Sequence, residues 1–148
     1  MRDLSILLCV SALAACSRGV ERSTAPREEI HSTLPADLLA RQRASDEQVL
    51  RSLRDAGADL SKPHSIEYHF ICPNRTAAAP VIEWGRASGY RPSRVSDGEY
   101  KGRAYVYFDL VRNTVPTIEN LTPQTIAMLE AARRFAVEFD GWACDVVR

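Results

Sequence analysis

The hydrophobic pattern along the chain switches repeatedly between a helical and a strand spacing. Apolar residues recur every three or four positions over 35–56, interrupted by Gln42 and Asp46, which predicts a helix with Gly57 as its C-terminal stop. Within this segment Ser45 and Gln48 match a capping box, so the helix is expected to bend or restart there. Residues 64–72, HSIEYHFIC, alternate between apolar and polar positions, as expected of a strand with one buried face.

The rest of the sequence continues this succession of helices and strands. The segment 76–89, TAAAPVIEWGRASG, predicts a helix that ends at Gly89. Residues 90–96 predict a short edge strand, since Pro92 cannot donate a hydrogen bond to a neighbouring strand. The other expected elements are a turn at 97–102, a strand at 103–112, a helix with Thr122 as N-cap and Pro123 as first residue, and a strand at 137–147.

The predicted order, one helix followed by β-α-β-β-α-β, indicates an α+β fold. In a ferredoxin-like sandwich this order places both crossover helices on one face of an antiparallel sheet. The side chains expected beneath the helices are Ile66, Tyr68, Phe70, Val106, Phe108, Leu110, Val137, Phe139 and Ala143. The opposite face is expected to carry Glu67, His69, Tyr105, Tyr107, Asp109, Glu138, Asp140 and Trp142.

Three interpretations of this aromatic and acidic face stay open. The first is a protein-binding face, because Tyr and Trp offer large contact areas and carboxylates select basic partners. The second is structural: the leucines of the N-terminal helix, or a second copy, cover the face and bury the indole. The third is acid–base catalysis by His69 with Asp109 or Asp140. The candidate partner-binding residues are His69, Tyr105, Tyr107, Asp140 and Trp142.

The leucine stripe favours the structural interpretation, because it needs a surface to bury against. Catalysis is disfavoured because no nucleophile, metal cluster or glycine-rich loop accompanies the histidine, so no catalytic residues are predicted. The three histidines lack the spacing of a metal site, and neither a metal nor a cofactor is expected. The 148-residue chain has 19 basic and 19 acidic residues, which argues against direct nucleic-acid binding.

The N-terminal sequence predicts export and lipid anchoring. Residues 1–15 have the length and apolar run of a signal peptide, and the LAAC that ends at Cys16 resembles a bacterial lipobox. Cys16 would carry the lipid, 16–33 would form a flexible tether, and 34–148 would form the domain. This predicts a lipid-anchored envelope protein that faces the periplasm, and Ser17 favours the outer membrane over the inner one.

Two cysteines, Cys72 and Cys144, fall within the predicted domain. They lie near the ends of strands expected to be antiparallel neighbours. The end of one such strand meets the start of the other, so the two Cα atoms would lie beyond the ~7 Å limit for a disulfide. The two cysteines are therefore expected to stay unpaired.

Three stretches carry a family resemblance: IEYHF at 66–70, WGRASGYRPSRV at 84–95 and RRFAVEFDGW at 133–142. They resemble the regulator of ribonuclease E activity B (RraB) family. The helix at 34–58 also has a counterpart, so the likeness covers about 35–147. The resemblance implies a ferredoxin-like domain without catalytic residues or cofactor, which inhibits ribonuclease E by binding its non-catalytic scaffold region.

The predicted export signal conflicts with that partner, since ribonuclease E works on the cytoplasmic side. The sequence is therefore expected to encode a non-enzymatic, protein-binding regulator presented as an envelope lipoprotein, with an unidentified partner. The alternative is a cytoplasmic-type inhibitor that binds the scaffold region of ribonuclease E. A third possibility, an envelope hydrolase, is disfavoured.

Overall fold

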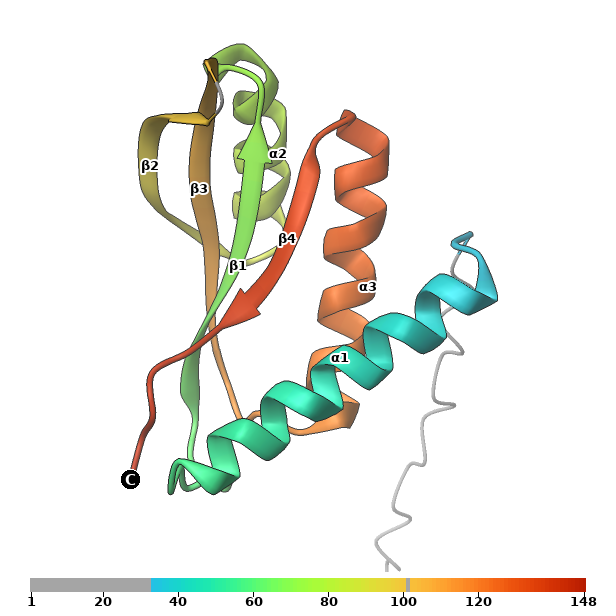
Figure 1. The fold of residues 1–148 in the computed structure, drawn as a ribbon, viewed down its shortest axis with the longest axis vertical. Coiled ribbons are helices and arrows are strands. Elements are labelled where there is room, and N and C mark those ends of the chain that lie inside the picture. The colour runs from blue at the N-terminus through green and yellow to red at the C-terminus, as the bar shows by residue number, and fades with distance from the viewer. Residues whose placement is uncertain (1–32, 101) are drawn as a thin grey trace, which may run out of the picture.

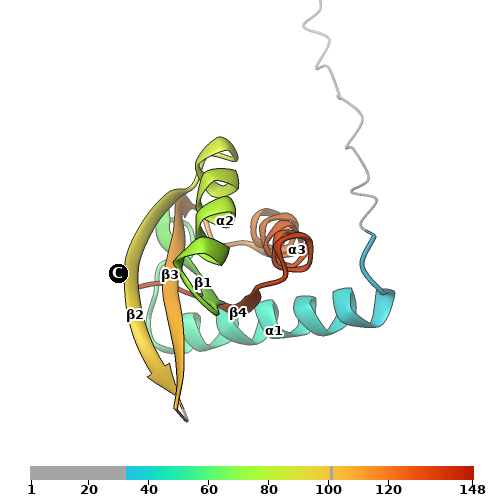
Figure 2. The same cartoon turned by 90° about the horizontal axis from the view of Figure 1, so that it is seen from above.

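The computed structural model describes residues 33–100 and 102–148, which form a four-stranded antiparallel sheet with helices on one face (Figures 1 and 2). The strand order is β2-β3-β1-β4, which confirms the predicted ferredoxin-like arrangement. The predictions for the signal peptide, Cys16 and the tether to residue 32 lie outside the described residues. The elements are α1 (Ala36–Asp55), β1 (His64–Cys72), α2 (Arg75–Ala87), β2 (Arg91–Tyr100), β3 (Arg103–Thr114), α3 (Ile118–Phe135) and β4 (Glu138–Ala143).

The sheet has a covered face, beneath α2 and α3, and an open face on its other side (Figure 2). Alternate residues of β1 are almost fully buried on the covered face, and the rings of Phe70 and Phe108 stack there at 5.3 Å between centroids. Each such side chain contributes roughly 1.5–3 kcal/mol by leaving water. The predicted covered sets on β1 and β3 are confirmed: Ile66, Tyr68, Phe70, Val106, Phe108 and Leu110 are 0–3% exposed.

The helix α1 is continuous, so the predicted bend at Ser45 is wrong. Asp46, which interrupts the apolar stripe, is fully buried and acts as a hydrogen-bond centre. Its Oδ1 accepts from Gln42 Nε2 and Trp142 Nε1, both at 2.9 Å, and its Oδ2 accepts from Thr125 Oγ1 at 2.9 Å. These bonds join α1 to α3 and β4, and α1 packs against α3 beside β4 (Figures 1 and 2). The open face around His69 therefore stays uncovered by α1.

A bulge in β4 overturns the predicted facing of Trp142. Trp142 lies opposite Tyr68, and Phe139 lies opposite Phe70, so β4 has one more residue than β1 between these two core-facing pairs. Gly141 lies within this bulge and has φ +99°, a conformation that glycine adopts at little cost. Trp142 is therefore 7% exposed on the covered face, while Ala143, predicted to be covered, lies opposite Glu67 on the open face. Strict alternation fails here because the strand contains an inserted residue.

Several predicted boundaries also differ from the structure. The third helix begins at Ile118, because the Thr117 hydroxyl accepts from Asn120 N at 3.3 Å and caps it; Thr122 and Pro123 lie inside. The strand β2 runs through most of the expected turn to Tyr100, since cross-strand pairing continues to the tip of the hairpin. The last strand ends at Ala143 rather than residue 147.

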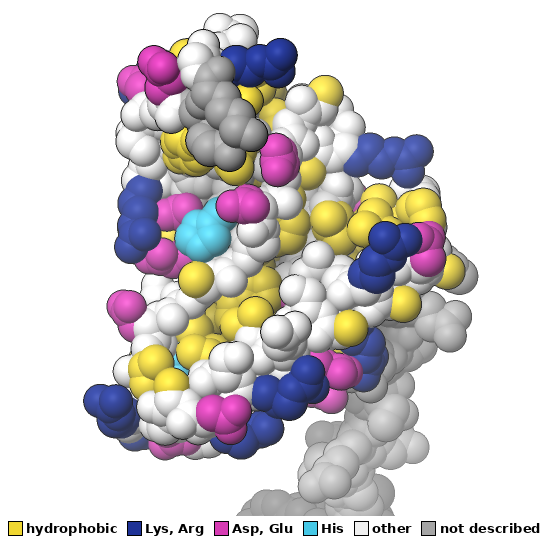
Figure 3. Space-filling view, in the orientation of Figure 1, with side chains coloured by type: hydrophobic (Ala, Val, Ile, Leu, Met, Phe, Trp, Pro, Cys, Tyr) yellow, Lys and Arg dark blue, Asp and Glu magenta, His cyan; other side chains and the backbone are white. Residues whose placement is uncertain are grey.

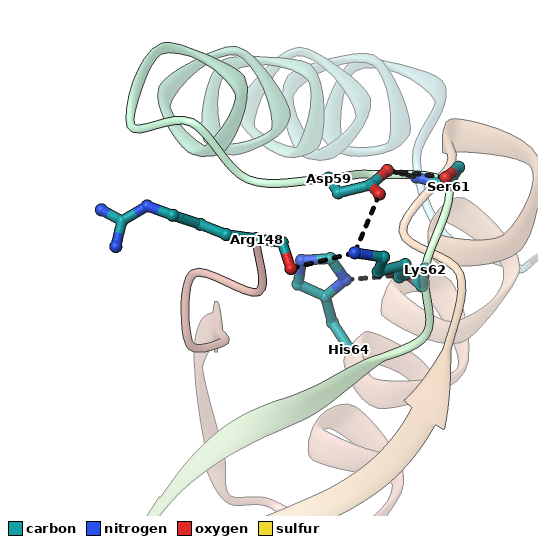
Figure 4. A network of polar contacts seen from close by, with 5 residues as sticks. All are labelled: Asp59, Ser61, Lys62, His64 and Arg148. Carbon is teal, nitrogen blue, oxygen red and sulfur yellow. Dashed lines mark hydrogen bonds and ion pairs between the residues drawn. The ribbon is translucent and has the colours of Figure 1, made fainter.

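The residues after β4 are held beside the start of β1 (Figure 4). Asp59 N donates to Val147 O at 2.7 Å, and Lys62 Nζ donates to Arg148 O at 2.9 Å. His64 is 1% exposed and its Nδ1 donates to Lys62 O at 2.9 Å, so it is a buried structural histidine. Hydrogen bonds from Ser61 lower the pKa of Asp59, which keeps a charge available to pair with Lys62.

The two cysteines of the domain are free thiols. Cys72 ends β1 opposite Val106, whereas Cys144 follows Ala143, whose partner Glu67 lies near the other end of β1. This register agrees with the prediction that Cys72 and Cys144 do not pair. Burial raises the pKa of each thiol to about 11, so both stay protonated at neutral pH and neither is an activated nucleophile.

Candidate functional site: the open face of the sheet

The open face collects polar and aromatic side chains from β1, β2 and β3. Of the predicted contact residues, His69, Tyr105 and Tyr107 lie on it, and the exposed Asp140 borders it from β4. Trp142 does not, because the bulge turns it into the core. Figure 3 shows a histidine at the surface flanked by acidic side chains, with a basic side chain beyond them.

The centre of the site is a hydrogen-bonded pair, His69 and Asp109. They lie directly opposite each other on β1 and β3, and His69 Nδ1 donates to Asp109 Oδ1 at 2.6 Å. The Asp109 side chain is 7% exposed and that of His69 is 31% exposed. The carboxyl group therefore fixes the imidazole orientation and leaves the outer part of the ring accessible to a partner.

Arg94 is a member of the site that sequence reasoning missed. It lies in a bulge of β2, between Ser93 and Ser96, with φ +51°. Its Nη2 is 3.3 Å from Glu67 Oε2 and its Nε is 3.6 Å from Asp109 Oδ2. Alternation alone gave no signal for this bulge, although an arginine near an acidic face is a chemical hint that could have been followed.

Two tyrosines form an aromatic patch beside the charged group. The rings of Tyr105 and Tyr107 lie 6.4 Å apart, inclined at 51°. The ring of Tyr107 lies over Gly98 of β2, where an added Cβ would collide with it. Because Gly98 has no side chain, the Tyr107 ring can pack directly against the backbone of β2.

The side chains enclose a shallow hollow of about 290 Å³ on the open face. Its lining includes His69, Arg94, Ser96, Tyr107 and Asp109, with Asp140 at the exposed edge. No hydrogen bond joins Ser96 to His69 in the described structure, so the histidine–aspartate pair lacks an attached nucleophile. Such a surface suits recognition of another protein, in which aromatic area and charge act together.

Between residues 33 and 148, leaving out 101, no group of His, Cys, Asp and Glu is arranged to hold a metal ion. Over the same residues no helix has the length and hydrophobicity needed to cross a bilayer.

The chain is similar to regulators of ribonuclease activity over most of its described length. The profile of the RraB family, Regulator of ribonuclease activity B, matches residues 43–144. A Regulator of ribonuclease activity B from Pseudoalteromonas atlantica is 28% identical over 101 residues, covering 66% of this chain and 84% of that protein. Another from Proteus mirabilis is 27% identical over 106 residues, covering 70% of this chain and 73% of that protein.

The family match spans most of α1, from residue 43, and every later element to the end of β4. It therefore covers the complete sandwich, including both bulges and the whole open face. Regulators of this family are non-enzymatic, in agreement with the expectation that the chain is not an enzyme. The chain belongs to the RraB family of regulators of ribonuclease activity.

Proposed function

We propose that the chain inhibits ribonuclease E by binding it as a folded protein module and performs no chemistry itself. The observation that carries this proposal is the family match over 43–144, which includes the entire sandwich. The predicted alternative of ribonuclease E inhibition thus has more support than an envelope regulator with an unidentified partner.

The open face is the proposed contact surface. Its aromatic rings and its partly exposed charged side chains meet the usual requirements of a protein interface. The helix α1 packs against α3 and accepts a hydrogen bond from Trp142 through Asp46. It therefore does not have to move away from the open face before a partner binds.

The test is inhibition of RNA cleavage by ribonuclease E in the presence of the full-length chain. We expect cleavage to slow in proportion to bound protein, and Asp140→Lys to weaken both binding and inhibition because it reverses a charge on the open face. The matched control is Glu83→Lys, an equal charge change at an exposed position on α2. A wild-type chain that neither binds nor slows the ribonuclease contradicts the proposal.

We also propose that Cys16 is lipidated, with residues 1–15 removed as a signal peptide. The support is the sequence Leu13-Ala14-Ala15-Cys16 after an apolar run. Metabolic labelling with a fatty acid is expected to mark the wild type in the membrane fraction and to leave Cys16→Ser unlabelled. A labelled, periplasm-facing domain would be separated from ribonuclease E and would direct the search to an envelope partner. An unlabelled wild type contradicts the lipidation proposal.

A further inference from the structure

We propose that the hollow on the open face binds an arginine side chain of the partner protein, and that Arg94 occupies this position in the free protein. The inference rests on the proposed function, because it specifies the chemistry of the partner segment. Its core is an acceptor on Asp109 that the fold leaves without a hydrogen bond.

Asp109 presents an unmet acceptor to the hollow. Its side chain is 7% exposed, its Oδ1 is bonded to His69, and its Oδ2 is buried with no hydrogen-bond partner among the described residues. Buried polar atoms are nearly always paired, because an unpaired one has lost its water without replacement. A hydrogen-bond donor that enters the hollow would therefore pair with Asp109 Oδ2, for which the free protein provides only a positive charge beyond hydrogen-bond distance.

That distant charge is the guanidinium of Arg94. Its Nε lies 3.6 Å from Asp109 Oδ2, beyond hydrogen-bond range, and its contact with Glu67 is 3.3 Å. The Arg94 side chain is 67% exposed, so solvent screens both contacts. Its backbone φ of +51° is unfavourable for a residue with a side chain. Arg94 is thus held over the carboxylates by loose contacts that a competing guanidinium can replace.

The composition of the hollow favours arginine over lysine. Asp109 and Asp140 supply carboxylate oxygens from two different strands, and Tyr107 and Ile71 supply aromatic and aliphatic surface. A guanidinium is planar, carries several donors in a fixed fork and packs its faces on such surface. A lysine ammonium is a compact, strongly hydrated charge that uses less of this surface.

The experiment compares two fluorescein-labelled peptides of equal length and charge, an arginine-glycine repeat and a lysine-glycine repeat. Their binding to the full-length chain in detergent is followed by fluorescence anisotropy. We expect the arginine peptide to bind about 10-fold more tightly, as bidentate charge-assisted bonds allow. Asp140→Asn is expected to weaken arginine binding about 3- to 10-fold, whereas the control Glu83→Gln on α2 leaves it unchanged.

Arg94 provides the sharper test. Arg94→Gln is expected to tighten arginine-peptide binding about 3- to 10-fold, because it removes the competing guanidinium as well as one positive charge. Arg91→Gln is the matched control: it lies on the same strand, is exposed, and changes the net charge equally. Arg91→Gln should change the affinity for the arginine peptide by no more than about 2-fold, because it alters only the long-range electrostatic interaction, which salt screens. Equal binding of the two peptides, or equal effects of the two substitutions, overturns the inference.

The ribonuclease assay separates this inference from the proposed function. If wild type inhibits and neither Asp140→Asn nor Arg94→Gln alters inhibition, the hollow is not the partner contact and the inference is overturned, while the proposed function stands. If wild type does not inhibit but the arginine preference and the Arg94 effect are present, the proposed function is overturned. That result supports an arginine-bearing protein other than ribonuclease E as the partner.

Discussion

The two edge strands of the sheet each contain a bulge, and the two bulges direct their side chains in opposite directions. In β4 the register shift around Gly141 turns Trp142 into the core, where its Nε1 donates to Asp46. In β2 the shift between Ser93 and Ser96 places Arg94 over the open face. Both use positive φ, but one residue is a glycine and the other an arginine.

The difference separates a structural bulge from a bulge that serves recognition. Gly141 adopts its conformation without strain, and the indole it turns inward is held by packing and a buried hydrogen bond. Arg94 bears backbone strain and is held by loose, exposed contacts. Residues with strained backbone conformations cluster at functional sites. Four substitutions test this contrast, and their expected effects on stability decrease from Trp142 to Arg94.

Trp142→Ala is expected to lower the free energy of unfolding by about 3 to 5 kcal/mol, because it leaves a cavity and removes a donor to Asp46. Urea unfolding of the variant measures this loss. Trp142→Phe is the control: it keeps most of the packing and should lose only about 1 to 3 kcal/mol with the hydrogen bond. Unchanged stability in Trp142→Ala would place the indole back at the surface.

Asp46→Ala is expected to cost about 1 to 3 kcal/mol, because it leaves the buried indole N–H of Trp142 without its acceptor, whereas the Thr125 hydroxyl keeps Thr122 O at 3.1 Å. The comparison is Asp55→Ala, at the exposed C-terminal end of the same helix, which should change stability by less than about 0.5 kcal/mol. The same urea titration serves both variants. Similar values for the two would show that the Asp46 centre does not hold α1 in place.

Gly141→Ala is expected to cost about 1 to 2 kcal/mol from backbone strain alone. An added Cβ at this position has open space, with nothing within 4 Å, so no collision contributes. Thermal or urea unfolding gives the value, and tryptophan fluorescence reports whether the indole stays buried. A stable variant with unchanged fluorescence would mean that the bulge does not depend on glycine.

Arg94→Gly is expected to change the free energy of unfolding by less than about 1 kcal/mol, since relief of strain offsets the lost ion pairs and the greater freedom of the unfolded chain. Peptide binding should nevertheless respond, because the competing guanidinium has gone. A large loss of stability would contradict the view that the Arg94 bulge serves recognition rather than folding.

The alternation of apolar residues sufficed to predict the element order, the strand order and the covered sides of β1 and β3. It failed at Trp142, where an extra residue changes the parity of β4, and it gave no expectation for Arg94, which lies in the bulge of β2. It also misread Asp46 as an interruption, because a carboxyl at a core position is recognisable as a hydrogen-bond centre only when its three donors are known. Those donors come from positions 42, 125 and 142, which local spacing does not relate.

The sequence by itself determined the layers of this protein, because periodicity is a local property that a strand or helix carries in its own residues. The tertiary structure decided which way Trp142 and Arg94 point and which acceptor of Asp109 stays open. These outcomes depend on the pairing of strands that are distant in the chain. An inserted residue can be recognised only from the register against the neighbouring strand, and it moves the side chains that follow it to the other face of the sheet.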